Sequence, residues 1–434
     1  MASTNITPVL LPNTRWWIAK SMHRSPEMLS RSYGATSSSI ELNRSTLPVI
    51  EGKADTPRYL ITLDRGIGDT VLVGLSAVDQ ILRNDPAAYS KIDILCTPLQ
   101  SQIFEYDPRI NRVIQTNKKF SSGPLVTEWL HGIILDAEAA QIIQFLQSRR
   151  YEAVLPTFVA PGLYLRLRSH LMYPQVFKLA KNLLLQGSPS DIPIRKFIRQ
   201  MVNKYFGKDI PASELRDDVL LYLDTLQIQK AVTVIEQIKK NSDAGSENAR
   251  VLLVATDSGS VVTRPPTCLL APALADVLRK SHHLIVGILP GYTDTMAAKN
   301  LELALLSEFA GRVFMLPDES AFTLLETAAL IDQADVFVTG DTGVMHLATA
   351  TKKVRKAETI AFVPKNSVKI IAIFGGTNPD VWGDSERTII VGRGRREQRS
   401  FSPGYVKEMY NLRDKDLFDH ISPQQLTEAI ISLL

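Results

Sequence analysis

The sequence has few cysteines and no long apolar run. Its 434 residues include two cysteines, Cys96 and Cys268, which lie far apart, each inside or beside an apolar stretch. This pattern indicates neither a disulfide framework nor a zinc site. No apolar run approaches the roughly 18 residues of a transmembrane helix, and the first residues lack the apolar core of a signal peptide. We therefore expect a protein without a transmembrane segment, in a reducing, cytoplasmic compartment.

The length of the chain favours two domains, because a single hydrophobic core stops growing at roughly 250–300 residues. Hydrophobic residues make up 45% and charged residues 22%, as in soluble globular proteins. Residues 1–57 are rich in Ser, Thr, Asn and Pro and are interpreted as a polar N-terminal extension. The polar stretch at residues 239–248 is the best candidate for a linker. The sequence thus predicts one domain at residues 58–240 and a second at residues 250–434.

Short apolar or β-branched runs alternate with helix-period segments in both halves, which predicts two parallel α/β sheets and Rossmann-like domains. Strands are predicted at Arg58–Asp64, Ile92–Cys96, Glu152–Leu155, Val251–Ala255, Leu284–Leu289, Val336–Thr339 and Ile370–Phe374. In the second half, helices are predicted at Leu269–Lys280, Ala297–Phe309, Leu324–Ala334 and Pro423–Ile431.

A glycine-containing turn follows the predicted strand Val336–Thr339. The residues Gly340-Asp341-Thr342-Gly343 lead into a helix that carries His346 near its start. Backbone N–H groups and the positive end of a helix then meet at one place, which suits a diphosphate. The plainer interpretation is an Asp or Thr helix cap beside a core histidine.

A second glycine-rich loop, Phe374–Gly383, follows the next predicted strand. Ligands of open α/β sheets bind outside the carboxyl ends of the strands. Two such loops on adjacent strands therefore favour a binding pocket over two unrelated helix caps.

These loops resemble the signature of glycosyltransferase family 9, the ADP-heptose:lipopolysaccharide heptosyltransferases. The resemblance lies in Ala334–Ala348, Phe374–Pro379 and Trp382-Gly383, in the opening loop with Gly68-Asp69, and in Asp107–Ile114, which resembles the segment after the family's third strand. It extends from about residue 58 to the end of the chain. The resemblance implies an α/β protein of the GT-B fold, in which two Rossmann-like domains with parallel sheets face a central cleft.

By this resemblance, the chain is a transferase that moves a sugar from a nucleotide-diphosphate donor to an acceptor hydroxyl. Asp69 would be the general base that takes the proton of that hydroxyl, and a simple helix N-cap is its plainer interpretation. Asp69 and Asp341 are expected at strand ends on opposite sides of the cleft. No metal and no cofactor is expected, because the nucleotide sugar is a substrate. The diphosphate would be bound by Asp341, Thr342, Gly343, His346 and Thr377.

Two departures from the family pattern concern the donor side. The lysine that the family carries after the first strand of the second domain is absent, and Arg264 is the candidate for its role as a phosphate clamp, with a solvated loop residue as the alternative. An insertion between Ala350 and Ile370 falls where the donor is expected. Its cations are Lys352, Lys353, Arg355, Lys356, Lys365 and Lys369.

Basic residues gather between Arg149 and Lys208, where eleven Lys or Arg residues accompany two acids. Solvated helix faces are the usual explanation for such charges. The alternative is a surface for an anionic acceptor or an RNA, with Arg166, Arg168, Lys178 and Lys181 as its candidates. The charge asymmetry keeps a second function open: a tRNA-dependent enzyme on the GT-B scaffold, comparable with the arginine-containing cyclodipeptide synthases, that uses aminoacyl-tRNA. A catalytically silent nucleotide-sugar binding module is the third hypothesis.

Overall fold

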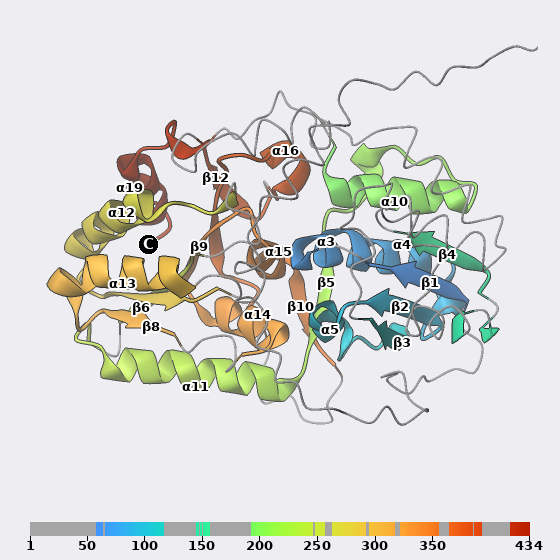
Figure 1. Ribbon diagram of the computed structural model, residues 1–434, viewed down its shortest axis with the longest axis horizontal. Coiled ribbons are helices and arrows are strands. Elements are labelled where there is room, and N and C mark those ends of the chain that lie inside the picture. Colours follow the sequence, from blue (N-terminus) through green and yellow to red (C-terminus); the bar gives the residue numbers. More distant parts are fainter. Residues whose placement is uncertain are drawn as a thin grey trace, which may run out of the picture. The chain divides into compact units, whose positions relative to one another are not determined.

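The computed structural model describes residues 58–63, 66–116, 145–146, 148–149, 151–156, 192–245, 248–256, 263–291, 295–316, 322–355, 364–384, 386–392 and 417–434. These residues all belong to one compact unit, Leu47–Leu434 (Figure 1). The expected N-terminal extension, residues 1–57, lies outside them.

The first sheet has four parallel strands. The strand order is β3-β2-β1-β4, so the chain moves outward from β1 in one direction and then places β4 on the other side of β1. Such a reversal is the point where open α/β sheets bind ligands. Most of Asp107–Ile114 belongs to the third strand itself, rather than following it as the family resemblance suggests. The strands are β1 (Tyr59–Thr62), β2 (Ile92–Cys96), β3 (Ile110–Gln115) and β4 (Ala153–Pro156).

One continuous helical segment follows β1 in the sequence. It consists of α3 (Ile67–Asp69), the π-helix η1 (Thr70–Leu75) and α4 (Ser76–Asn84). A helix after this strand agrees with the predicted alternation of strands and helices, but the π-helix was not foreseen. Stretches of π-helix are rare and frequently occur at functional sites. All six residues of η1 are buried, so the packing around this stretch is tight.

The second sheet has six parallel strands in the order β12-β11-β9-β6-β7-β8. The order of the chain reverses between β6 and β9, which places the topological switch point there. The four strands predicted for this half are confirmed to within one residue at each end. The strands are β6 (Arg250–Ala255), β7 (Leu284–Leu289), β8 (Val313–Met315), β9 (Val336–Gly340), β11 (Lys369–Ile373) and β12 (Thr388–Val391).

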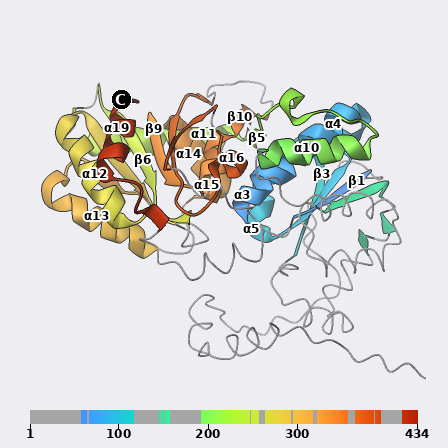
Figure 2. The ribbon, with the colours of Figure 1, turned by 90° about the horizontal axis from the view of Figure 1, so that it is seen from above.

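Helices cover both faces of this sheet. On one face α12 (Thr267–Lys280), α13 (Thr295–Phe309) and α19 (Pro423–Ile431) pack with strand residues such as Leu252 and Val254, and the three helices lie together in Figures 1 and 2. The other face, which includes Val251 and Leu253, packs with α11 (Thr225–Asn241) and α14 (Leu324–Gln333). The alternation follows because successive side chains of a strand point to opposite faces. The helix predicted at Pro423–Ile431 is confirmed.

A separate two-stranded sheet joins segments from both halves of the sequence. β5 (Leu220–Leu223), which follows α10 (Ile194–Tyr205), pairs in parallel with β10 (Thr351–Val354), which follows α15 (Gly343–Thr349). The remaining short helices are α5 (Pro98–Ser101), α16 (Pro379–Trp382), η2 (Pro86–Ala88), η3 (Gln102–Phe104) and η4 (Ala212–Glu214). No helix in the described ranges is both long enough and apolar enough to cross a membrane.

The linker was expected at residues 239–248, but helix α11 does not end until Asn241. Lys239 and Lys240 lie in its last turn. Cations in this position interact favourably with the helix C-terminus, so these polar residues extend the helix rather than end it. A turn at residues 242–245 follows and leads towards β6.

Candidate functional site

Three neighbouring strand ends of the six-stranded sheet carry hydroxyl or carboxyl groups. β9 lies between β6 and β11. Thr256 directly follows β6, Asp341 and Thr342 follow β9, and Thr377 lies in the loop after β11. The hydroxyl oxygens of Thr256 and Thr377 are buried without a hydrogen-bond partner among the described residues. Buried polar groups are normally bonded, so these hydroxyls are suited to bind a ligand.

Thr256 was missed in the sequence. Its position immediately after a predicted strand, next to the strand that precedes Asp341, is the signal that points to it. Thr256 is almost fully buried, with 1% of its surface exposed.

The turn after β9 combines a helix cap with an acid–imidazole pair. The Thr342 hydroxyl accepts a hydrogen bond from the Met345 N–H at 3.4 Å and so caps α15. The cap interpretation is therefore right for Thr342. Asp341 has another role, because its Oδ1 lies 3.4 Å from Nε2 of the buried His346. This contact orients the imidazole at the start of α15.

A segment of the second half crosses directly over Gly340. A Cβ on Gly340 would lie 2.1 Å from the Thr263 carbonyl oxygen and 2.7 Å from Cδ of Pro265. Only a residue without a side chain fits there. The backbone of Arg264, between these two residues, therefore passes next to the Asp341 turn.

The segment that carries Asp69 packs against α15. A Cβ on Gly68 would lie 2.6 Å from Cδ2 of His346, and a Cβ on Gly343 would lie 2.8 Å from Cβ of Ile67. Asp69 itself is half-buried in the first turn of the helix. The helix N-cap is Gly66, and the Asp69 side chain makes no cap hydrogen bond. The interpretation of Asp69 as an N-cap is therefore wrong. The preceding residue, Gly68, contacts the candidate diphosphate turn.

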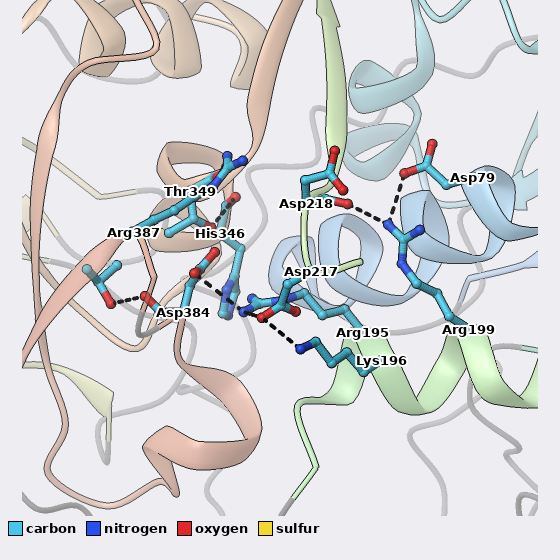
Figure 3. Close-up of polar contacts among 11 residues, drawn as sticks. Asp79, Arg195, Lys196, Arg199, Asp217, Asp218, His346, Thr349, Asp384 and Arg387 are labelled. Atoms are coloured by element: carbon cyan, nitrogen blue, oxygen red, sulfur yellow. Dashed lines mark hydrogen bonds and ion pairs between the residues drawn. The ribbon is translucent and has the colours of Figure 1, made fainter. Parts of the chain in front are cut away.

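Two cations lie at the opposite end of α15. Arg387 donates a hydrogen bond from Nη1 to the Thr349 carbonyl oxygen at 2.6 Å (Figure 3), and the buried Lys352 donates from Nζ to the Ala348 carbonyl oxygen. Cations stabilise the C-terminal end of a helix. Burial lowers the pKa of Lys352 to about 8, against the effect of the nearby Asp332 carboxylate.

The basic insertion is thus partly structural. Lys352 is buried in β10, Lys365 donates from Nζ to the Gln333 carbonyl oxygen at 3.2 Å, and Lys369 donates to that of Leu433 at 2.6 Å. These three cations bond the backbone of the second half, which corrects the expectation that the insertion places its cations at the donor. Lys356 lies outside the described residues.

The basic stretch is also partly buried. Arg195 and Arg199 are 2% and 0% exposed and form ion pairs with Asp217 and Asp79 (Figure 3). These two arginines therefore do not belong to a polyanion-binding surface. The four residues named for such a surface, Arg166, Arg168, Lys178 and Lys181, lie outside the described residues.

Metal ligands do not gather in the described ranges, where no three His, Cys, Asp or Glu side chains are close enough to hold an ion. Both cysteines are free, Cys96 buried and Cys268 exposed.

One protein-family model matches part of the second half of the chain. Residues 320–406, which include the Asp341 turn and the Thr377 loop, match the family model of glycosyltransferase family 9 (heptosyltransferase). No curated protein sequence matches the chain.

Solved structures with a similar fold include three glycosyltransferases. A glycosyl transferase family 9 protein from Veillonella parvula has a TM-score of 0.59 and 14% identity, with 87% of this chain and 97% of that chain covered. The E. coli ADP-heptose lipopolysaccharide heptosyltransferase II has a TM-score of 0.54 and 15% identity, over 87% and 98% of the two chains. The E. coli heptosyltransferase WaaC, solved with ADP, has a TM-score of 0.52 and 15% identity, over 87% and 100%. The parallel sheets and their switch points agree with these likenesses, so the chain has the α/β GT-B fold of these glycosyltransferases, and residues 320–406 match the model of glycosyltransferase family 9.

Proposed function

We propose that the protein transfers a sugar from a nucleotide-diphosphate donor to an acceptor hydroxyl, with Asp69 as the general base. The observation that carries this proposal is the direct packing of Gly68 against His346 and of Ile67 against Gly343. It brings the Asp69 segment of the first sheet to the turn after β9 in the second. Donor and base can then act at one place.

The diphosphate is assigned to the three neighbouring strand ends of the six-stranded sheet. Thr377 offers a buried hydroxyl that lacks a partner in the described ranges. Gly343 has no side chain, which lets Ile67 and Gly68 of the Asp69 segment pack directly against this turn. Arg264 is assigned the positive charge that holds the diphosphate, because its neighbours Thr263 and Pro265 pack against Gly340 at the start of the Asp341 turn. The residues assigned to the diphosphate are Asp341, Thr342, Gly343, His346, Thr377 and Arg264.

In this mechanism, the Asp69 carboxylate accepts the proton of the acceptor hydroxyl while the hydroxyl oxygen attacks the anomeric carbon. The bond between that carbon and the diphosphate oxygen breaks, and negative charge develops on the leaving nucleoside diphosphate. Arg264 and the donors around Gly343 stabilise this charge, which is the electrostatic contribution that lowers the barrier.

The first donor to test is an ADP-linked sugar, because two of the structural relatives are described with ADP or as ADP-heptose transferases. The acceptor is proposed to be anionic and to bind at Arg166, Arg168, Lys178 and Lys181. A cytoplasmic location is part of the proposal, in keeping with two free cysteines. The comparisons lend no support to the aminoacyl-tRNA alternative, and two arginines of the basic stretch are buried in ion pairs.

The test replaces Asp69 with Asn, which keeps the shape of the side chain but cannot accept the proton. We expect kcat for sugar transfer to fall by roughly 10²–10⁴-fold, while calorimetry shows unchanged affinity for ADP. Asp276→Asn, at a half-exposed position of α12, is the matched control and should leave both quantities unchanged. Absence of ADP, UDP and GDP binding to the unaltered protein would refute the proposal.

A further inference from the structure

Helix α10 turns a polar stripe towards the interior of the protein. Arg195, Arg199 and Asn203 follow one another at intervals of four residues and therefore lie on one face of the helix. Their exposed fractions are 2%, 0% and 0%. A buried helix face is usually apolar, and removing two guanidinium groups from water is costly unless each is paired. The contacts of this stripe therefore need an explanation.

The far end of the stripe holds α4. Arg199 donates from Nη2 to Oδ2 of Asp79 at 3.1 Å (Figure 3). The Asn203 side-chain oxygen accepts hydrogen bonds from Gln80 at 2.6 Å and from Asn84 at 2.8 Å. Since α4 continues the helical segment that starts at α3, these contacts fix α10 relative to Asp69.

The near end of the stripe reaches the second half of the chain. Arg195 forms a two-pronged ion pair with Asp217, just before β5. Its Nη2 also lies 3.5 Å from Oδ1 of Asp384, which follows α16 (Figure 3). The planar guanidinium therefore hydrogen-bonds one carboxylate and faces a second at ion-pair distance, an arrangement that an ammonium group holds with less directional control.

Asp384 is in turn connected to α15. Its carbonyl oxygen accepts hydrogen bonds from the backbone N–H groups of Arg387 and Thr388, and the Arg387 side chain bonds the carbonyl oxygen of Thr349, the last residue of α15. A series of polar contacts therefore runs from the helix that carries Asp69, through α10, to the helix that carries His346.

We propose that Arg195 is a positioning residue whose ion pair with Asp384 sets the separation between the Asp69 segment and the turn before α15. Buried ion pairs contribute little net stability, and the fixing of one geometry is a role that some of them have. The effect on the reaction rests on the proposed function. The effect on the separation does not.

The separation can be measured without a ligand. A spin label on the exposed Cys268 of α12 and a second on Tyr89→Cys, at a position 51% exposed in the first half, report the distance by pulsed electron resonance. Cys96 is buried. We expect Arg195→Gln and Asp384→Asn to shift or broaden the distance distribution. Lys204→Gln, at an exposed position on the same helix, should leave it unchanged.

The kinetic consequence is a loss of kcat on the order of 10- to 100-fold in Arg195→Gln, with ADP affinity unchanged by calorimetry. Unchanged distances in both folded variants would overturn the inference, and Asp384→Asn serves alone if Arg195→Gln does not fold. A changed distance in a protein that binds no nucleotide would reject the proposed function and leave the positioning role in place.

Discussion

Gly68 lies directly against His346, because a Cβ on Gly68 would be 2.6 Å from Cδ2 of the imidazole. The two residues are 278 positions apart in the sequence. Gly68 directly precedes the proposed base Asp69, and His346 belongs to the proposed diphosphate site. Their contact therefore makes the base and the donor site depend on each other.

Replacing Gly68 with Ala should displace the His346 ring and lower ADP affinity and transfer together. We expect kcat/KM to fall by about 10- to 100-fold, as for other small misplacements of reacting groups. Gly66→Ala is the control, since a Cβ on Gly66 meets nothing within 4 Å. If Gly68→Ala behaves like Gly66→Ala in calorimetry and in transfer, the close contact has no functional weight.

Gly340→Ala should act on stability as well as on binding. The new Cβ would lie 2.1 Å from the Thr263 carbonyl oxygen, so the segment with Arg264 must shift. Overpacking of this kind costs about 1–3 kcal/mol of unfolding free energy. Urea unfolding measures the loss, and ADP titration reports the displacement of Arg264. Wild-type values in both experiments would contradict the crossing described above.

The unfolding free energy should depend on pH through Lys352. The pKa of this side chain falls from 10.5 to about 8 on burial, so between these values the unfolded chain binds more protons than the folded protein. Stability from this group therefore rises with pH across that window, by at most about 1.4 kcal/mol per pH unit. Urea unfolding at pH 7.5 to 10 should show the wild type gaining stability relative to Lys352→Met. A constant difference between the two proteins would show that the pKa of Lys352 is not lowered in the folded protein.

Reversing the charges at Arg166, Arg168, Lys178 and Lys181 should impair use of an anionic acceptor and leave ADP affinity unchanged. The four residues belong to the first half of the sequence, whereas the diphosphate loops belong to the second. Binding through several anionic contacts weakens steeply with salt, so the wild-type KM for the acceptor should rise with ionic strength. Parallel loss of acceptor use and ADP binding in a folded variant would show that these residues are not a separate surface.

The strands and the motif loops were predictable because short apolar runs end in glycine and hydroxyl residues. The last helix was predictable for a similar local reason, as Ser422 and Gln425 form a capping box around Pro423. These signals lie within a few residues of each other in the sequence.

The buried cations were not predictable in this way. Lys and Arg are rarely buried unless paired, and the partners of Arg199 and Lys352, Asp79 and Asp332, lie far away in the sequence. The pairing of β10 with β5 is likewise a tertiary contact, between a lysine-containing segment of the insertion and a strand of the first half.

The π-helix between Asp69 and α4 determines the angle, about the helix axis, between Asp69 and the faces of α4. Each residue turns an α-helix by about 100°, so the direction in which Asp69 points and the direction of the α4 face held by Arg199 are related by the winding of Thr70–Leu75. If the same six residues wound as an ordinary α-helix, they would turn through about 600°, which is more than the wider turns of a π-helix give, so one of these faces would rotate relative to the other. The Asp69 side chain would then lie at a different angle to the α4 face held by Arg199, although every strand and every charged side chain would still be present.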